Sequence, residues 1–206
     1  VSFNKMKDKI YKYNINYKNT VFIISNHILA LYSIQYIDSI YTLGLIVLQY
    51  QLCGISITTG SHRLWSHRSF KAKDPLRFLL MLFISMSNQG SIYHWVRDHR
   101  VHHKHSDTEL DPHNINKGFF FSHIGWLLTN KSPEVIKAGK EIDCNDLLND
   151  WIVVLNKLLW PYLDIFMCYI VPSLYGYYMY SSLLKGFLLF GCLRWVLLSH
   201  ATWSVN

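Results

Sequence analysis

The chain has 206 residues, of which half are hydrophobic and 16% are aromatic, while only 16% are charged. Soluble domains usually carry about 25% charged residues, so this composition argues against an ordinary soluble domain and favours a membrane protein. The four cysteines lie far apart and form no Cys-x-x-Cys pair, which argues against a disulfide framework or a thiolate zinc site.

Four long apolar segments predict membrane helices, because a helix needs about 20 apolar residues to cross the hydrocarbon core of a bilayer. We expect these helices at about 19–37, 39–61, 162–181 and 186–206. Short links separate the first two segments and the last two, so each pair predicts a hairpin. A further run at 78–96 ends in polar residues and predicts an amphipathic or partly buried helix on the membrane surface. The predicted fold class is an all-α membrane protein, a single domain of four transmembrane helices in two hairpins.

The formal charge of +7 is compatible with a nucleic-acid partner, but the positions of the basic residues indicate membrane topology instead. Of the 20 Lys and Arg residues, 18 lie in 1–18 or 62–157, which two hairpins would place on one side. By the positive-inside rule that side is the cytosol, so we expect cytosolic termini and no nucleic-acid partner. Arg194 lies inside a predicted membrane helix, where it either pairs with Asp164 or extends its charge to the interface.

Three histidines in the stretch "HRVHH", namely His99, His102 and His103, are spaced to share one face of a helix. His62 and His67 follow the second apolar segment and lie five residues apart, about 140° on a regular helix. Either the helix ends there or the two histidines serve different metals, and the second option suits a dinuclear centre. Imidazole suits zinc, copper, iron and nickel, and neither group contains the glutamate of a zinc protease motif. Many neutral imidazoles around two metals are typical of a non-haem iron centre that activates oxygen.

Four stretches of the sequence resemble the membrane-bound acyl-CoA desaturases of the stearoyl-CoA delta-9 type. They are "GSHRLWSHRSFKA", "WVRDHRVHHKHSDTELDPHN", "GFFFSHIGWLL" and "HATWSVN", and the likeness runs from about Asn19 to Asn206. The resemblance implies a cytosolic helical cap that holds a di-iron centre, with dioxygen as co-substrate. By motif position, the residues that match iron ligands are His62, His67, His99, His102 and His103, while Asn206 matches an asparagine that reaches iron through a water. The family continues with further histidines beyond the last residue here, so we expect the chain to be a fragment with an incomplete metal site.

The resemblance also implies the reaction, its partners and its location. The substrate would be a saturated fatty acyl-CoA such as stearoyl-CoA, which would receive a cis double bond at the delta-9 position. Electrons would come from NADH through a reductase and cytochrome b5, which would dock on the basic cytosolic face. The protein would be a multi-pass protein of the endoplasmic reticulum membrane.

Substrate contacts are carried over from the same motifs. Matches to residues that hold the coenzyme A portion are Asn19, Arg97, Asp98 and Lys131. Matches to residues that line the bend of the acyl tunnel are Gln89, Trp95, Thr202 and Trp203, although the two tryptophans could instead anchor the protein at the membrane interface. Tyr50 and Gly54 lie one helical turn apart and match the closed end of the tunnel, where a bulky Tyr50 would stop the methyl end of the chain.

Two other functions are compatible with the sequence. A fatty acyl or sphingolipid hydroxylase would use the same iron centre and would add a hydroxyl group in place of a double bond. A membrane scaffold that binds zinc structurally would consume no oxygen. Product and metal analysis distinguish these readings.

Overall fold

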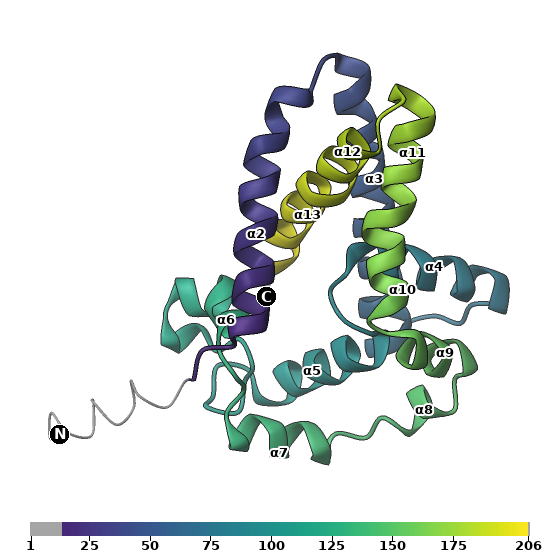
Figure 1. The fold of residues 1–206 in the computed structure, drawn as a ribbon. Helices are drawn as coiled ribbons and strands as arrows, with labels where there is room; N and C mark the ends of the chain where they lie inside the picture. Colours follow the sequence, from purple (N-terminus) through teal and green to yellow (C-terminus); the bar gives the residue numbers. More distant parts are fainter. Residues whose placement is uncertain (1–13, 206) are drawn as a thin grey trace, which may run out of the picture.

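The computed structural model describes residues 14–205, and every regular element in that range is a helix (Figure 1). The all-α prediction is therefore confirmed. One isolated backbone pairing, between Ile15 and Thr129, ties the start of the described chain to the middle of the sequence. Asn206 lies outside the described residues.

Residues 17–66 form the first of two helical hairpins. Its elements are α2 (Tyr17–Ser33), the short 3-10 turn η1 (Ile34–Tyr36), α3 (Ile40–Ser56) and the π-helical segment η2 (Ile57–Ser66). Ser39 caps α3, because its hydroxyl accepts a hydrogen bond of 3.1 Å from the Thr42 backbone N–H. The hairpin therefore turns sharply at this polar residue, one position after Asp38.

Residues 162–203 form the second hairpin. Its elements are α10 (Tyr162–Ile165), the π-helical η5 (Phe166–Ile170), α11 (Val171–Tyr180), α12 (Leu183–Gly186), the π-helical η6 (Phe187–Leu193) and α13 (Arg194–Trp203). The two arms touch at Gly176 and Gly186, where a Cβ on Gly176 would lie 2.2 Å from the Gly186 Cα. Only glycine permits this approach of two helix backbones. Figure 1 shows that both hairpins turn at the same end of the molecule, where Thr42 Oγ1 lies 2.7 Å from the Tyr180 hydroxyl.

Two continuous helices are long and apolar enough to cross a membrane, Ile40–Ser66 and Leu183–Trp203. A third candidate arises if the bent pair Trp151–Leu159 and Tyr162–Tyr180 counts as one span, although its two parts meet at 78°. The helix α2 has 17 residues, slightly fewer than the roughly 20 that a helix needs to cross the hydrocarbon core. The predicted layout of four spans in two hairpins therefore stays a prediction.

The remaining elements form a helical cap at the end opposite the hairpin tips (Figure 1). They are α4 (Asp74–Ser87), α5 (Ile92–His105), η3 (Ile115–Lys117), the π-helical η4 (Phe121–Gly125), α6 (Trp126–Leu128), α7 (Pro133–Glu141), α8 (Asn145–Leu148) and α9 (Trp151–Leu159). The single helix expected over 78–96 is wrong, because α4 ends at Ser87 and α5 begins at Ile92. Asn88 and Gly90 break the helix with φ angles of +48° and +92°, a region that asparagine and glycine tolerate better than other residues.

Arg194 is completely buried in the second hairpin. Its Nε donates to the Phe190 carbonyl at 2.7 Å, and a terminal nitrogen lies 3.2 Å from the Cys168 sulfur. Both expectations for this residue are wrong: the side chain does not reach the interface, and its hydrogen bonds go to a carbonyl and to sulfur rather than to Asp164. The four-residue spacing to Phe190 explains this, since it lets the guanidinium bond within its own helix.

Candidate metal centre and adjoining pocket

The first histidine pair lies where α3 widens into the π-helical segment η2. The His67 backbone N–H donates to the His62 carbonyl at 3.0 Å, a bond across five residues in place of the usual four. The wider turn brings the two side chains together, so their Nε2 atoms lie 3.2 Å apart. Of the two alternatives for this spacing, the one with separate metals does not fit the geometry, because both nitrogens meet in one place. The other alternative is confirmed, since the helix ends at Ser66, directly before His67.

The helix α5 adds two more imidazoles to the same place. His99 Nε2 lies 3.2 Å from His67 Nε2 and 3.0 Å from His103 Nε2. The ligand nitrogens of these four histidines all lie within 4.8 Å of one another. We call His62, His67, His99 and His103 the four-histidine cluster. Four nitrogens at this separation surround a space suited to one metal ion.

The surroundings of the cluster favour the neutral form of two of its imidazoles, those of His99 and His103. Burial, followed by the neighbouring imidazoles of His103 and His62, lowers the pKa of His99 to about 3. Burial also lowers the pKa of His103 below its ordinary value. Neutral imidazole is the form that binds a metal, because the ligand nitrogen must carry a lone pair.

His102 lies on the same helix but belongs to a second group. Its Nδ1 lies 2.9 Å from the Asp111 carboxylate, which is 1% exposed and also accepts hydrogen bonds from the backbone N–H groups of Asp107 and His113. The hydrogen bond to Asp111 raises the pKa of His102 despite partial burial. Burial and repulsion from His102 lower the pKa of His113 to about 4. His102, Asp111 and His113 form a second set of candidate metal-binding side chains.

Two arginines tie the histidine segments to the short helix α8. Arg68 follows His67 directly, and its NH2 lies 2.8 Å from Asp146 Oδ1. Arg100 follows His99 and binds Asp146 through both terminal nitrogens, at 2.9 Å and 2.7 Å. Burial alone would raise the pKa of Asp146, but the two arginines outweigh it and lower the pKa to about 2. The Asp146 carboxylate of α8 thus binds both the arginine next to His67 and the arginine next to His99.

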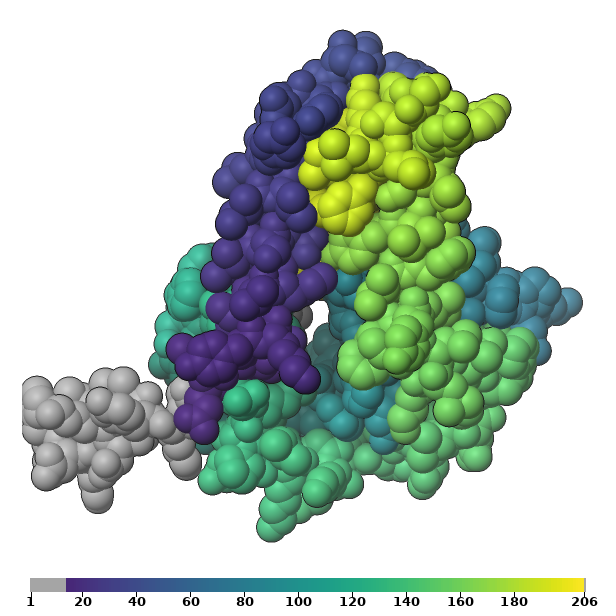
Figure 2. Space-filling model, viewed as in Figure 1, coloured from purple at the N-terminus to yellow at the C-terminus, as the bar shows by residue number. Residues whose placement is uncertain are grey.

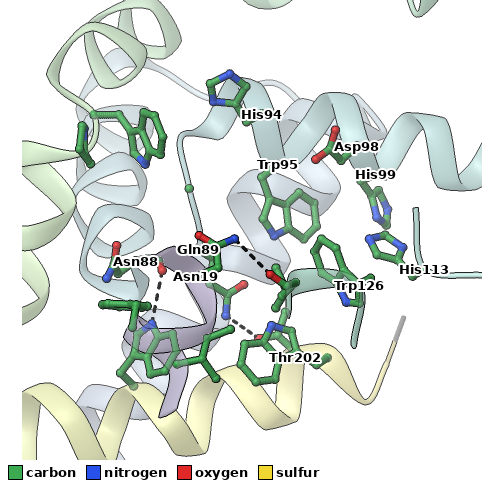
Figure 3. A pocket seen from close by; sticks show the side chains of 18 of the residues that line it. Asn19, Asn88, Gln89, His94, Trp95, Asp98, His99, His113, Trp126 and Thr202 are labelled. Carbon is green, nitrogen blue, oxygen red and sulfur yellow. Dashed lines mark hydrogen bonds between the residues drawn. The ribbon is translucent and has the colours of Figure 1, made fainter. Parts of the chain in front are cut away.

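A cavity of about 450 Å³ adjoins the four-histidine cluster, and His99 belongs to both. The cavity lies between α2, the α4–α5 link, the α9–α10 corner and α13, and its opening is visible between α2 and α10 in Figure 2. Its lining is mostly apolar and aromatic, which suits a hydrophobic ligand. Figure 3 shows the labelled side chains around it, with His99 and His113 near one end and Asn88 near the other.

Seven of the ten side chains predicted to bind substrate line this cavity. They are Asn19, Gln89, Trp95, Asp98, Lys131, Thr202 and Trp203. Two of them are joined, because the Gln89 amide donates to the Thr202 hydroxyl at 3.1 Å (Figure 3). The other three, Arg97, Tyr50 and Gly54, do not line it. Arg97 instead binds Asp98, while Tyr50 packs in an apolar cluster with Cys53 and Leu198 that Trp95 joins to the cavity.

The polar part of the cavity lining centres on Asp98. Its carboxylate forms ion pairs with Lys131 and with Arg97, the latter at 2.9 Å. Burial would raise the pKa of Asp98, but the two cations outweigh it and keep the pKa below its ordinary value. The side chains therefore present a fixed arrangement of one negative and two positive charges beside an apolar cavity.

Sequence reasoning missed several residues of the site. His94, His113, Trp126, Trp160 and Trp195 line the cavity, and Asp111 binds His102. The "DPHN" stretch contains Asp111 and His113 close after the histidine group, and this spacing was a usable signal. The tryptophans gave none, because their contacts join segments that are distant in the sequence.

The sequence of the chain is similar to that of a family of known proteins. Residues 40–205 match the fatty acid desaturase family. The chain is 41% identical over 191 residues to acyl-CoA desaturase 1 of Tachysurus fulvidraco, 42% over 200 residues to the acyl-CoA delta-9 desaturase of Acheta domesticus, and 41% over 196 residues to human stearoyl-CoA desaturase 5. These alignments cover 92–95% of the chain but only 56–59% of the relatives, so the chain spans a little under three fifths of their length. With a match over most of its residues, the chain belongs to the fatty acid desaturase family.

Proposed function

We propose that the protein is an acyl-CoA desaturase that inserts a cis double bond, at the delta-9 position, into a saturated fatty acyl-CoA such as stearoyl-CoA. In this reaction two adjacent carbons of the chain lose two hydrogens, while dioxygen, two electrons and two protons form two waters. The observation that carries the proposal is His99, which belongs to both the four-histidine cluster and the wall of an apolar cavity. A redox metal there would lie directly beside a bound acyl chain.

The donor atoms of the site fit iron. The four-histidine cluster offers nitrogen donors only, and His102 is free to offer Nε2, since its Nδ1 binds Asp111. Imidazole without thiolate suits a non-haem iron centre. The proposed ligands are His62, His67, His99 and His103 for one iron and His102 for a second, with Asn206 as an indirect contact carried over from the family motif.

Iron would supply the oxidising power that breaks unactivated C–H bonds, for which acid–base side chains are insufficient. The chain's own residues bind and orient the substrate. Lys131 and Arg97 offer cations to the phosphates of coenzyme A, with Asp98 fixing their positions. Gln89 and Thr202, joined at 3.1 Å, narrow the cavity where the acyl chain would bend. The aromatic walls exclude water from the reacting carbons.

The same proposal includes location and partners. The protein would span the endoplasmic reticulum membrane with its termini and cap in the cytosol, and cytochrome b5, reduced by an NADH-dependent reductase, would deliver electrons to the cap. The support is the concentration of 18 of the 20 basic residues in 1–18 and 62–157, because cytosolic loops of membrane proteins are enriched in Lys and Arg.

The test is expression of the full-length protein in a host that lacks its own desaturase, followed by mass spectrometry of the fatty acids. We expect monounsaturated products, and about two irons per protein after purification. Hydroxylated products would instead indicate a hydroxylase, and zinc without oxygen consumption would indicate a scaffold.

Substitutions of single histidines test which of them bind the proposed metal ions. We expect His62→Ala, His67→Ala, His99→Ala, His102→Ala and His103→Ala each to abolish the unsaturated product. His105→Ala is the matched control, because His105 lies on the same helix but outside both metal-binding groups. Full activity in any of the five variants would remove that residue from the proposed ligands.

A further inference from the structure

Three histidines outside the proposed iron site form a hydrogen-bonded chain. His27 comes from α2, His123 from η4 and His200 from α13. His27 Nε2 lies 2.9 Å from His200 Nε2, and His123 Nε2 lies 2.9 Å from His200 Nδ1. His200 is therefore the centre of the chain, with one partner on each ring nitrogen.

The hydrogen positions in the neutral chain follow from one anchor. His27 Nδ1 lies 2.7 Å from the Ile23 carbonyl, which can only accept, so His27 carries its hydrogen on Nδ1 and accepts on Nε2. His200 must then donate through Nε2 and accept through Nδ1, and His123 must donate through Nε2. Each ring is held in one tautomer, with all donors oriented in the same direction along the chain.

This arrangement is not a metal site. His200 uses opposite ring nitrogens for its two partners, so the three imidazoles do not present their nitrogens to one point. Among residues 14–205, the groups able to hold a metal are the four-histidine cluster and the group around His102. The chain instead joins three segments that are distant in the sequence.

Those three segments supply three walls of the cavity. The α2 helix contributes Asn19 and Phe22, the α6 helix after η4 contributes Trp126, and α13 contributes Thr202 and Trp203. The Trp203 ring packs edge-to-face against two members of the chain, with centroids 5.3 Å from His200 and 6.0 Å from His123. The cavity lining does not include His27, His123 or His200 themselves, so they act on a ligand only through their neighbours.

We propose that His27, His200 and His123 are positioning residues that fix Thr202 and Trp203 against the acyl chain and thereby set which carbons face the metal centre. This inference rests on the proposed desaturase function. Oriented hydrogen bonds among partly buried side chains resist sliding of α13 against α2 and η4. Small displacements of a positioning group change reaction geometry strongly, so loss of the chain should alter where the double bond forms.

The experiment compares His200→Leu, which removes both bonds, with the pair His123→Leu and His123→Gln. Glutamine retains an N–H donor at the reach of Nε2, so His123→Gln keeps the bond to His200 while His123→Leu removes it. The readouts are the dissociation constant for stearoyl-CoA by calorimetry, the position of the double bond by mass spectrometry, and the metal content. The tautomers are read from ¹⁵N-histidine NMR spectra of the full-length protein in detergent.

We expect His200→Leu and His123→Leu to bind stearoyl-CoA about tenfold more weakly and to yield mixed double-bond positions, with unchanged metal content. The affinity of His123→Gln for stearoyl-CoA should stay within about twofold of that of the unaltered protein. This variant should also place the double bond at a single position. Among the NMR signals of these three histidines, that of His27 should be an Nδ1–H tautomer and those of His200 and His123 should be Nε2–H tautomers. Equal impairment of His123→Gln and His123→Leu, or unchanged affinity and product in His200→Leu, would overturn the inference. If the unaltered protein makes no unsaturated product, the proposed function fails, and the affinity and tautomer measurements still test the chain.

Discussion

His102 Nδ1 and Asp111 Oδ1 lie 2.9 Å apart, and the carboxylate that makes this contact has no exposed surface on its side chain. A carboxylate accepts hydrogen bonds and donates none when ionised, so it fixes the His102 hydrogen on Nδ1. The lone pair is therefore on Nε2, the only nitrogen left for a metal. Carboxylate partners of this kind commonly orient histidine ligands in metal sites.

We predict that Asp111→Asn reduces metal binding more than it reduces stability. The new amide can donate to His102 Nδ1, which would move the ring hydrogen to Nε2 and block the ligand position. We expect bound iron to fall from about two to about one per protein, with metal affinity at the remaining site weakened no more than about tenfold. The measurement is elemental analysis together with iron titration.

Asp107→Asn is the matched control for this prediction. Asp107 is exposed on the same loop and has a φ of +61°, a conformation that asparagine tolerates well. The Asp107→Asn variant should retain the full metal content. Two tightly bound irons in Asp111→Asn would contradict the role given to the carboxylate.

A second prediction concerns membrane topology. Gln35 lies at the turn of the first hairpin and Ser181 at the turn of the second, and both are exposed. Cysteines at these positions should react with an impermeant thiol reagent only from the lumenal side. Lys140→Cys, in the cap, should react from the cytosolic side. The four native cysteines are buried, which keeps the background low, and cytosolic labelling at Gln35 or Ser181 would exclude the proposed orientation.

A third prediction concerns acyl chain length. Tyr50 packs against the apolar cluster that includes Leu198, and a Cβ on Gly54 would lie 3.5 Å from Leu198 Cδ1, an ordinary contact. If the tunnel ends here, Tyr50→Ala should shift preference to longer acyl chains and Gly54→Trp to shorter ones. The expected discrimination is at least about tenfold per two carbons, measured with acyl-CoA substrates of graded length. Gly54→Ala is the size control, and unchanged profiles in both variants would mean that the tunnel ends elsewhere.

A fourth prediction concerns pH. The pKa of Asp146 is lowered to about 2 by Arg100 and Arg68, so the folded state favours the ionised carboxylate. The contribution of Asp146 to stability is therefore complete above its unfolded pKa near 4 and is lost as the pH falls through about 2. Asp146→Asn should lower the melting temperature by a few degrees at pH 7, and its difference from the unaltered protein should shrink below pH 4. A difference that is constant from pH 7 to pH 2.5 would show that the ion pairs contribute nothing.

Sequence patterns predicted the helical class well, because apolar length and charge are local properties. Helix spacing alone grouped His99 with His102 and His103, but the structure keeps only His99 and His103 together and turns His102 to Asp111. For His62 and His67, a regular helical turn left open whether the helix ends or the two histidines serve different metals, because the π-helical widening of η2 leaves no signature in composition. The break after Ser87 was hidden for a related reason, since a single asparagine and a single glycine reverse the chain inside an apolar run.

Contacts between distant segments were beyond any local pattern. His27 and His200 are 173 residues apart and meet at 2.9 Å, and nothing in either local sequence indicates a partner. The surroundings of Arg194 were equally hidden, because an intrahelical carbonyl and two sulfurs took the place of the expected carboxylate.

The reversal at Asn88 and Gly90 also bears on the order of assembly. On a continuous helix, His99 would lie about 18 Å beyond Ser87 along the axis. The reversal instead returns α5 to η2, so all four imidazoles of the cluster come from a stretch of 42 residues between His62 and His103. Contacts that are close in sequence form early, and N-terminal segments are synthesised first. The four nitrogen donors of the cluster can therefore come together before the helices of residues 162–203 have been made.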